Sequence, residues 1–258
     1  MRLHGQARSQ SPVAHRPLGA LLAGLVLTFT AVGLRCIFEG STLWKLLPGP
    51  RFEVIELCGS ASDGTIIDGH GGWFNNGKLT ELIIRSEKNG SQWDRPADIT
   101  LRNFRIRGSI RIMGMGRNGE ASEVRASSIR DGHTARAQAA APTRILISGV
   151  EIEANRRIPL YLAPGATHVT FENSRLSGWS SSVGLYLDAE SAGNIIRNNA
   201  FAVRAGREVI AVDGSAENCI EGNRFDFLSH GGIYLYRNCG GRWPCPGQCP
   251  NSAWSVRK

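Results

Sequence analysis

No part of the 258-residue sequence after residue 35 repeats its apolar residues with the 3.6-residue period of a helix over ten or more positions. The apolar phrases break every five or six residues at Gly, Asn, Ser or Pro, which excludes a helical repeat. The fixed Leu and Asn consensus of leucine-rich repeats is also absent. The six cysteines show no recognised disulfide framework and no convincing zinc spacing, although an exported protein could still form disulfides.

Excess charge of one sign is also scarce outside the N-terminus. The formal net charge is +8, but residues 1–35 hold four arginines and no acid, so the remainder carries about +4. That excess is too small to indicate nucleic-acid binding by itself. Between Asp98 and Arg144, nine arginines outnumber four acidic residues, a local surplus that favours charge-assisted contact with an acidic partner or forms a solvated face.

One long uncharged run is present, in residues 18–34, which read LGALLAGLVLTFTAVGL and follow Arg8, His15 and Arg16. This pattern is typical of a signal-peptide core or a short membrane span, and a buried helix of a globular domain is the remaining alternative. No small-x-small cleavage site stands out, which favours an uncleaved anchor with its basic end inside. We therefore expect residues 1–35 to be a signal peptide or membrane anchor, and the rest to be periplasmic or extracellular.

The remaining sequence repeats an apolar phrase about every 24 residues. A template with apolar or Asn residues at its first, third and eighth positions matches six times, at separations of 23 to 25 residues. The matches are Ile99/Leu101/Ile106, Ser122/Val124/Ile129, Ile145/Ile147/Ile152, Val169/Phe171/Leu176, Asn194/Ile196/Phe201 and Asn218/Ile220/Phe225. A less regular copy, TIIDGHGGWF, occupies residues 65–74. The period predicts a coil that stacks on copies of itself.

A second phrase follows each first phrase with two inward positions around one outward position, as in a short strand. The inward pairs are Ile110/Ile112, Ala135/Ala137, Leu160/Leu162, Leu185/Leu187, Ile210/Val212 and Ile233/Leu235. Asn173 and Asn198 are equivalent in the repeat, and so are Asn199 and Asn223. We expect these asparagines to accept tight turn geometry and to hydrogen-bond along the stack.

The phrases HVTFENSRLSG, NIIRNNAF and NCIEGNRF resemble the repeats of right-handed parallel β-helix proteins of the pectate-lyase-like superfamily. The resemblance implies an all-β fold, a right-handed parallel β-helix of about seven coils over residues 65–240, preceded by the N-terminal hydrophobic helix. Residues 36–64 then form a linker and N-terminal cap. Residues 241–258 form an irregular tail, which either covers the last coil or reflects a truncation or frameshift of the sequence. The superfamily includes lyases, hydrolases, uronate epimerases and non-catalytic members, so the activity stays open.

Function is expected in the columns of outward side chains. These columns combine tyrosines for stacking on sugar rings, arginines for uronate or sulfate groups, and carboxylates for hydroxyls. The predicted substrate-binding residues are Arg111, Arg136, Tyr161, Tyr186, Tyr234 and Tyr236. Exposed Tyr and Arg that merely suit a soluble strand are the alternative.

Asp188 and Asp213 are the predicted catalytic pair, because stacking would place their carboxyls roughly 5 Å apart, a separation at which glycosidase carboxylates cooperate. Aspartates that only end strands or cap turns are the alternative reading. His230, in the next coil, is the third catalytic candidate, since a Gly-His-Gly lies near the catalytic aspartates of β-helix galacturonases. Here Ser229 replaces the first glycine. Asp68-Gly69-His70 and Asp131-Gly132-His133 are similar to part of a uronate-epimerase motif but are predicted to be turns.

The sequence therefore predicts an exported, membrane-anchored β-helix that binds an acidic polysaccharide and either cleaves or modifies it. The alternative is a non-catalytic glycan-binding or envelope assembly module that uses the same face for attachment. No metal or other cofactor and no nucleic-acid partner is predicted.

Overall fold

The computed structural model describes residues 52–115, 130–226, 228–236 and 255–256. Its first half contains β1 (Glu53–Cys58), β2 (Ile66–Asp68), β3 (Leu79–Arg85), β4 (Glu87–Asn89), β5 (Gln92–Asp94), β6 (Thr100–Met113), α2 (His133–Ala140) and β7 (Thr143–Arg156), with 3₁₀ helices at Ser60–Ser62 and Phe74–Gly77. Its second half contains β8 (Leu160–Leu162), β9 (Thr167–Glu172), β10 (Arg175–Ser180), β11 (Leu185–Leu187), β12 (Ile195–Arg197), β13 (Ala200–Phe201), β14 (Arg204–Ala205), β15 (Glu208–Asp213), β16 (Cys219–Glu221), β17 (Arg224–Phe225), β18 (Gly231–Tyr236) and β19 (Ser255–Val256).

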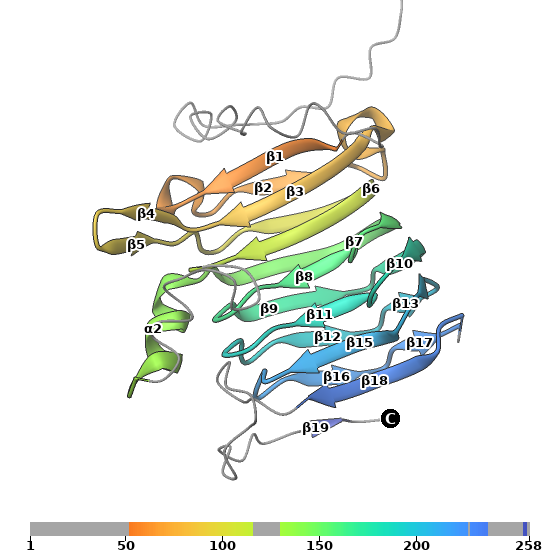
Figure 1. The fold of residues 1–258 in the computed structure, drawn as a ribbon. Coiled ribbons are helices and arrows are strands. Elements are labelled where there is room, and N and C mark those ends of the chain that lie inside the picture. The colour runs from red at the N-terminus through yellow and green to blue at the C-terminus, as the bar shows by residue number, and fades with distance from the viewer. Residues whose placement is uncertain (1–51, 116–129, 227, 237–254, 257–258) are drawn as a thin grey trace, which may run out of the picture.

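The strands stack as a parallel solenoid of about seven turns, with three strand positions in each turn (Figure 1). The β8 sheet contains β1, β3, the end of β6, β8, β11, β15 and β18. The β12 sheet contains β2, the starts of β6 and β7, β9, β12, β16 and β19. The β10 sheet contains the middle of β6, the end of β7, β10, β13, β14 and β17. Only the β4–β5 hairpin, outside the stack, is antiparallel among the described strands.

Apolar side chains fill the interior in columns, because equivalent inward positions of successive turns pair directly. In the β8 sheet, Leu160 pairs with Leu185, Leu185 with Ile210, and Ile210 with Ile233. The first three are fully buried, and Ile233, on the last described turn, is half-buried. In the β10 sheet, the rings of Phe201 and Phe225 stack with centroids 5.0 Å apart. The predicted inward register is thus confirmed for this column, whereas Leu235, predicted to point inward beside Ile233, is 50% exposed in β18.

One predicted coil is wrong. The template placed a coil on Ser122/Val124/Ile129 with Ala135/Ala137 as its inward pair, but β6 pairs directly with β7, through Leu101 and Ile147, and with β8, through Ile110 and Leu160. No turn of the stack can lie between them. Residues 133–140, HTARAQAA, form α2 instead, since alanine has the highest helix propensity and small side chains add little to a strand column.

The ends of the stack differ from the predicted boundaries in two places. β1 already pairs with β3, so the stack begins inside the segment 36–64 expected to be a linker and cap. β19 pairs with β16 inside the segment 241–258 expected to be irregular. The predicted hydrophobic helix at residues 18–34 lies outside the described residues. Within the described part of the chain, no helix is long and apolar enough to cross a membrane.

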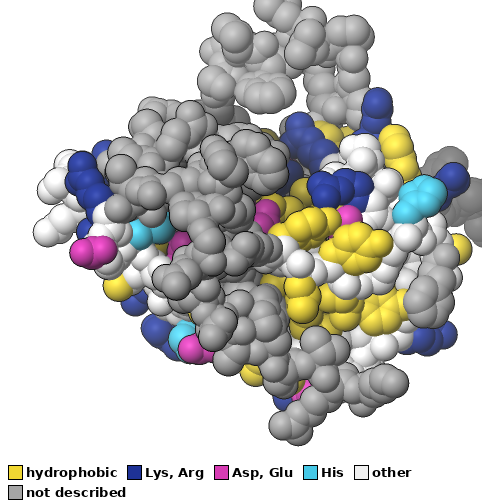
Figure 2. All heavy atoms as spheres, turned by 60° about the horizontal axis from the view of Figure 1, so that its bottom comes forward, with side chains coloured by type: hydrophobic (Ala, Val, Ile, Leu, Met, Phe, Trp, Pro, Cys, Tyr) yellow, Lys and Arg dark blue, Asp and Glu magenta, His cyan; other side chains and the backbone are white. Residues whose placement is uncertain are grey.

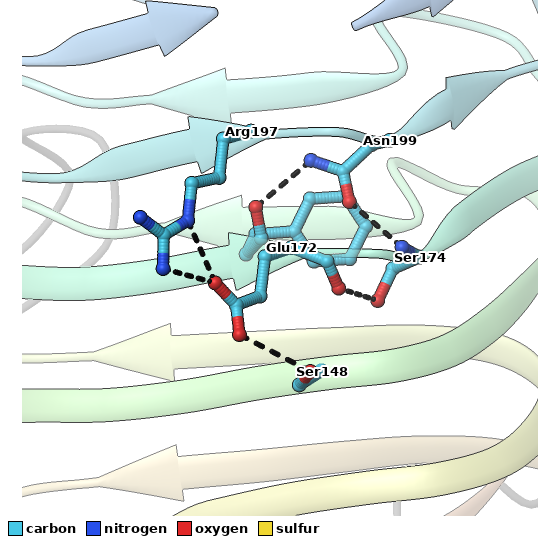
Figure 3. Close-up of polar contacts among 6 residues, drawn as sticks. Ser148, Glu172, Ser174, Arg197 and Asn199 are labelled. Atoms are coloured by element: carbon cyan, nitrogen blue, oxygen red, sulfur yellow. Dashed lines mark hydrogen bonds and ion pairs between the residues drawn. The ribbon is translucent and has the colours of Figure 1, made fainter. Parts of the chain in front are cut away.

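Asparagine ladders run along the stack, as predicted for Asn199 and Asn223. The Asn199 side-chain amide donates to Asn223 Oδ1 at 3.0 Å. The same amide donates to the Phe171 carbonyl (2.8 Å), and the Asn199 Oδ1 accepts from the Ser174 backbone N–H (Figure 3). Asn199 is 2% exposed. These bonds satisfy buried backbone groups at a turn that would otherwise cost free energy. Asn173, at the neighbouring turn position, has φ 50°, a left-handed conformation that asparagine tolerates.

Charged side chains on the outside of the β12 sheet pair between turns. Arg197 contacts Glu172 at 2.7 Å, and the Ser148 hydroxyl donates to the same carboxylate at 3.3 Å (Figure 3). The two Asp-Gly-His segments are turns, as predicted. His70 N–H donates to Asp68 Oδ1 (3.0 Å), and Gly132 is the left-handed N-cap residue of α2, which starts at His133.

Candidate functional site

The outward column of the β8 sheet starts at Arg111 and reaches Tyr234. Arg111 pairs with Tyr161, which pairs with Tyr186, and the column continues through Ala211 to Tyr234. This is the predicted order except for Arg136, which does not lie in the column. Arg136 is exposed on α2, where its guanidinium donates to the Asp131 carbonyl (3.3 Å). The remaining column, together with Asp188, Asp213 and Tyr236 of the column beside it and Glu208 at the start of β15, defines the candidate site, called here the tyrosine face.

The upper end of the tyrosine face is closed by an ion-pair network. Arg111 is 5% exposed and contacts the Glu81 carboxylate, which also accepts from Arg157 at 3.0 Å. The Arg111 guanidinium carbon lies 5.4 Å from the centre of the Tyr161 ring. Because Arg111 is buried and its charge is paired with Glu81, its guanidinium has little access to an external ligand.

Tyrosine and aspartate form a repeated contact between successive turns. The Tyr161 O–H donates to Asp188 Oδ2 at 2.5 Å, and the Tyr186 O–H donates to Asp213 Oδ2 at 2.5 Å. The two rings lie 5.7 Å apart. Asp188 and Asp213 take the same place in consecutive turns, because Leu187 pairs with Val212 directly before them. The contact is therefore one motif repeated along the stack.

The two copies of this motif differ in access to solvent. Tyr161 and Asp188 are both 2% exposed, and Asp188 Oδ1 also accepts from the Ala189 N–H at 2.8 Å. Tyr186 and Asp213 are half-buried. Burial raises the pKa of Tyr186 well above its ordinary value, and the hydrogen bond to Asp213 raises it further. At neutral pH Tyr186 is thus a neutral hydrogen-bond donor.

The lower end of the tyrosine face is open. Tyr234 is 49% exposed, and its ring lies 6.4 Å from that of Tyr236. The Tyr236 hydroxyl donates to Glu208 Oε1 at 2.8 Å and accepts from Arg207 at 2.9 Å. Burial, followed by this bond to Glu208, raises the pKa of Tyr236, while the nearby Glu208 carboxylate raises that of Arg207. Figure 2 shows hydrophobic side chains gathered on this end of the stack, beside basic ones.

His230 is exposed and lies away from the predicted aspartates. It precedes Gly231, which pairs with Glu208 at the start of β15, whereas Asp213 at the end of β15 pairs with Tyr236. That places His230 roughly 20 Å along the strand from the level of Asp213. The three predicted catalytic residues therefore do not form one cluster.

Sequence reasoning missed two contributors to this surface, Arg207 and Glu208, and the contact of Glu190 with α2. Arg207 lies in a bend and Glu208 is the first residue of β15, ahead of the Ile210/Val212 pair from which the columns were drawn. The Glu190 carboxylate accepts from the Thr134 hydroxyl of α2, and its carbonyl accepts from Gln138 at 3.0 Å. The repeat gave no signal for this contact, because α2 interrupts it. Within the described residues, no group of three His, Cys, Asp or Glu side chains is placed to hold a metal ion.

A family model described as right handed beta helix region matches residues 115–243, which is half of the chain. The chain belongs to the right-handed β-helix family. No curated protein and no solved structure matches it. Membership in the β-helix family agrees with the parallel stack and its asparagine ladders, and it leaves the activity to be argued from the tyrosine face.

Proposed function

We propose that this β-helix protein binds a polysaccharide along the tyrosine face. The observation that carries the proposal is the repeated row of Tyr186, Asp213, Tyr234 and Tyr236 along successive turns. Aromatic rings offer apolar surface to the C–H faces of sugars, and carboxylates accept hydrogen bonds from sugar hydroxyls. A polymer of repeating units suits a surface whose recognition groups also repeat.

We propose that the polysaccharide is acidic and that the protein binds it outside the cytoplasm. The arginine surplus between Asp98 and Arg144 supports an acidic partner, and the uncharged run at residues 18–34 supports export with membrane anchoring. Both statements rest on sequence alone.

Binding is favoured over cleavage because the predicted acid–base pair is committed to other contacts. Asp188 is buried and accepts from both Tyr161 and the Ala189 N–H, so it has little access to a glycosidic bond. Asp213 remains half-buried beside Tyr186. A non-catalytic glycan-binding or envelope assembly role is therefore the preferred form of the proposal, and cleavage or epimerisation by Asp213 is the alternative.

The test is equilibrium binding of the full chain to alginate, polygalacturonate and a neutral glucan. The Tyr234→Ala/Tyr236→Ala variant should weaken binding about tenfold, since each lost ring removes apolar contact with sugar. Trp73→Ala is the matched control, because Trp73 is 38% exposed but pairs with Arg105, outside the tyrosine face. Failure of the wild-type chain to bind any of the three polymers, or equal affinity of both variants, would overturn the proposal.

The same samples are assayed for new reducing ends and unsaturated uronate. We expect none. If the wild type releases such products and Asp213→Asn does not, while the variant still binds the polymer, the protein is an enzyme and the non-catalytic proposal is wrong.

A further inference from the structure

Most arginines on the described surface are neutralised by a carboxylate in a neighbouring turn. Such pairs are Arg105 with Glu151 (3.6 Å), Arg107 with Glu153 (3.3 Å) and Arg197 with Glu172 (2.7 Å). Arg156 and Arg204 are exceptions. Both are exposed, and neither forms an ion pair with an acidic side chain of the described residues.

Arg156 and Arg204 belong to the same corner of the stack, where the β10 sheet ends and the β8 sheet begins. Arg156 pairs with Ser180, and Ser180 with Ala205, so the two arginines are two turns apart, or about 10 Å along the axis. Arg207 follows at the same corner, with 54% of its side chain exposed. Its one described acidic partner, Glu208, lies 3.5 Å away and is only 3% exposed. The outer surface of the corner is thus basic.

An exposed tryptophan lies between the two arginines. Trp179 is 44% exposed and pairs with Asn155 on one side and Arg204 on the other. The Arg156 guanidinium carbon lies 5.7 Å from the centre of the Trp179 ring. An apolar ring beside exposed guanidinium groups suits a sugar that carries an anion, because the ring faces the C–H surface and a guanidinium binds carboxylate or sulfate in a bidentate manner. We call Arg156, Trp179, Arg204 and Arg207 the arginine corner.

The corner adjoins the tyrosine face, since Arg207 donates to the Tyr236 hydroxyl. The tyrosine face itself carries Asp213 and Glu208, and these carboxylates repel an anionic polymer unless cations nearby offset them. They also disfavour a nucleic acid, whose backbone is charged at each phosphate and which offers few hydroxyls to a carboxylate. A glycan with both hydroxyls and spaced anionic groups matches the two surfaces together.

We propose that the arginine corner binds the carboxylate or sulfate groups of an anionic polysaccharide whose hydroxyls contact the tyrosine face. The inference rests on the proposed function and names the residues that select the charged polymer. Specificity for charge then comes from the corner, while the tyrosine face contributes affinity that does not depend on the charge of the polymer.

The experiment compares polygalacturonate with its fully methyl-esterified form, which has the same backbone without the charge. The full chain, an Arg156→Gln/Arg204→Gln variant and an Arg136→Gln control are titrated with both polymers at low and moderate salt. Arg136 is an exposed arginine on α2, at the opposite side of the stack from β10 and β13 (Figure 1). The double variant should bind polygalacturonate about tenfold more weakly, with a smaller salt dependence, and should bind the ester as the wild type does.

The outcomes separate this inference from the proposed function. If the wild type binds both polymers equally, or if the double variant and Arg136→Gln lose affinity equally, the arginine corner does not select the charged polymer. The proposed binding along the tyrosine face is then unaffected. If the wild type binds neither of these two polymers, this inference fails, and the proposed function fails as well when alginate and the neutral glucan are also not bound. Duplex DNA is titrated in parallel, and tighter binding of DNA than of polygalacturonate, lost in the double variant, would overturn the choice of polysaccharide. Far-ultraviolet circular dichroism checks that each variant is folded.

Discussion

Tyr161 and Asp188 lie in successive turns of the stack, and the phenolic O–H of one donates to the buried carboxylate of the other at 2.5 Å. Tyr186 and Asp213 repeat the contact one turn later. The chain thus uses one hydrogen bond twice, as an interior contact in the first copy and as a half-buried surface contact in the second. This difference in burial gives the two tyrosines different predicted roles.

Tyr161→Phe should lower the free energy of unfolding by about 1–3 kcal/mol, because it removes a donor from a carboxylate that is 2% exposed. Urea denaturation measures the change. Tyr234→Phe is the control, since Tyr234 is 49% exposed and should change stability by less than about 0.5 kcal/mol. Equal losses in the two variants would show that the Tyr161–Asp188 bond adds nothing to stability.

Alkaline pH should destabilise the protein through Tyr186. The pKa of Tyr186 is raised in the folded state, first by burial and then by the bond to Asp213. Above about pH 10 a tyrosine of the unfolded chain loses its proton while folded Tyr186 keeps it, so the unfolded state binds fewer protons and stability falls as pH rises. Below that pH this contribution is fully present.

Urea midpoints between about pH 9 and about pH 11 test this linkage. The midpoint of Tyr186→Phe should fall less steeply with pH than that of the wild type. A residual slope is expected from Tyr236, whose pKa is also raised. Parallel curves for the two proteins would contradict the assigned role of Tyr186.

The inward columns could be predicted from sequence because burial requires the same kind of side chain at every turn. Leu160, Leu185 and Ile210 recur at one spacing for that reason. The segment containing Ala135 met the same template, since small alanines satisfy a strand pattern and a helix pattern alike. Only the direct pairing of β6 with β7 shows that this segment leaves the stack.

The candidate site was less predictable, because facing outward is not the same as being exposed. Tyr161 has the outward register but is packed between Arg111 and Tyr186. Which neighbour covers a ring depends on side-chain rotamers, which the repeat does not encode. Arg156 and Arg204 were missed because they lie at a corner next to turns, where the apolar columns give no register. Two neighbouring columns drawn through this corner, Arg156/Ser180/Ala205 and Asn155/Trp179/Arg204, would have found them.

Asn199→Ala should lower the free energy of unfolding by about 2–4 kcal/mol, because Asn199 is 2% exposed and bonds Ser174, Phe171 and Asn223. Asn173→Gly is the control. Asn173 is exposed with φ 50°, a conformation that glycine adopts without strain, so stability should change by less than about 1 kcal/mol. Thermal and urea unfolding measure both changes. If Asn199→Ala lowers the free energy of unfolding by less than the control does, the asparagine ladder does not stabilise the fold.

The segment between β6 and β7 should be removable, because its two ends already meet. A Cβ placed on Gly114 would lie 2.7 Å from the Ala141 side chain, and β6 pairs with β7 without help from the residues between them. Replacement of residues 116–140 by a short Gly-Ser linker should keep a β-rich circular dichroism spectrum and cooperative unfolding. Stability should fall by about 1–4 kcal/mol, since the bonds from Gln138 to Glu190 and from Arg95 to Gln138 are lost.

Deletion of residues 183–194, about half a coil, is the matched control for this replacement. It would put Ile195 at the place of Val183 and Arg197 of the β12 sheet at the place of the buried Leu185 in the β8 sheet, so every later turn loses its partner. We expect this variant to lose cooperative unfolding. If instead the half-coil deletion unfolds cooperatively and the 116–140 replacement does not, the segment containing α2 is part of the stack and the pairing of β6 with β7 is not sufficient to hold it.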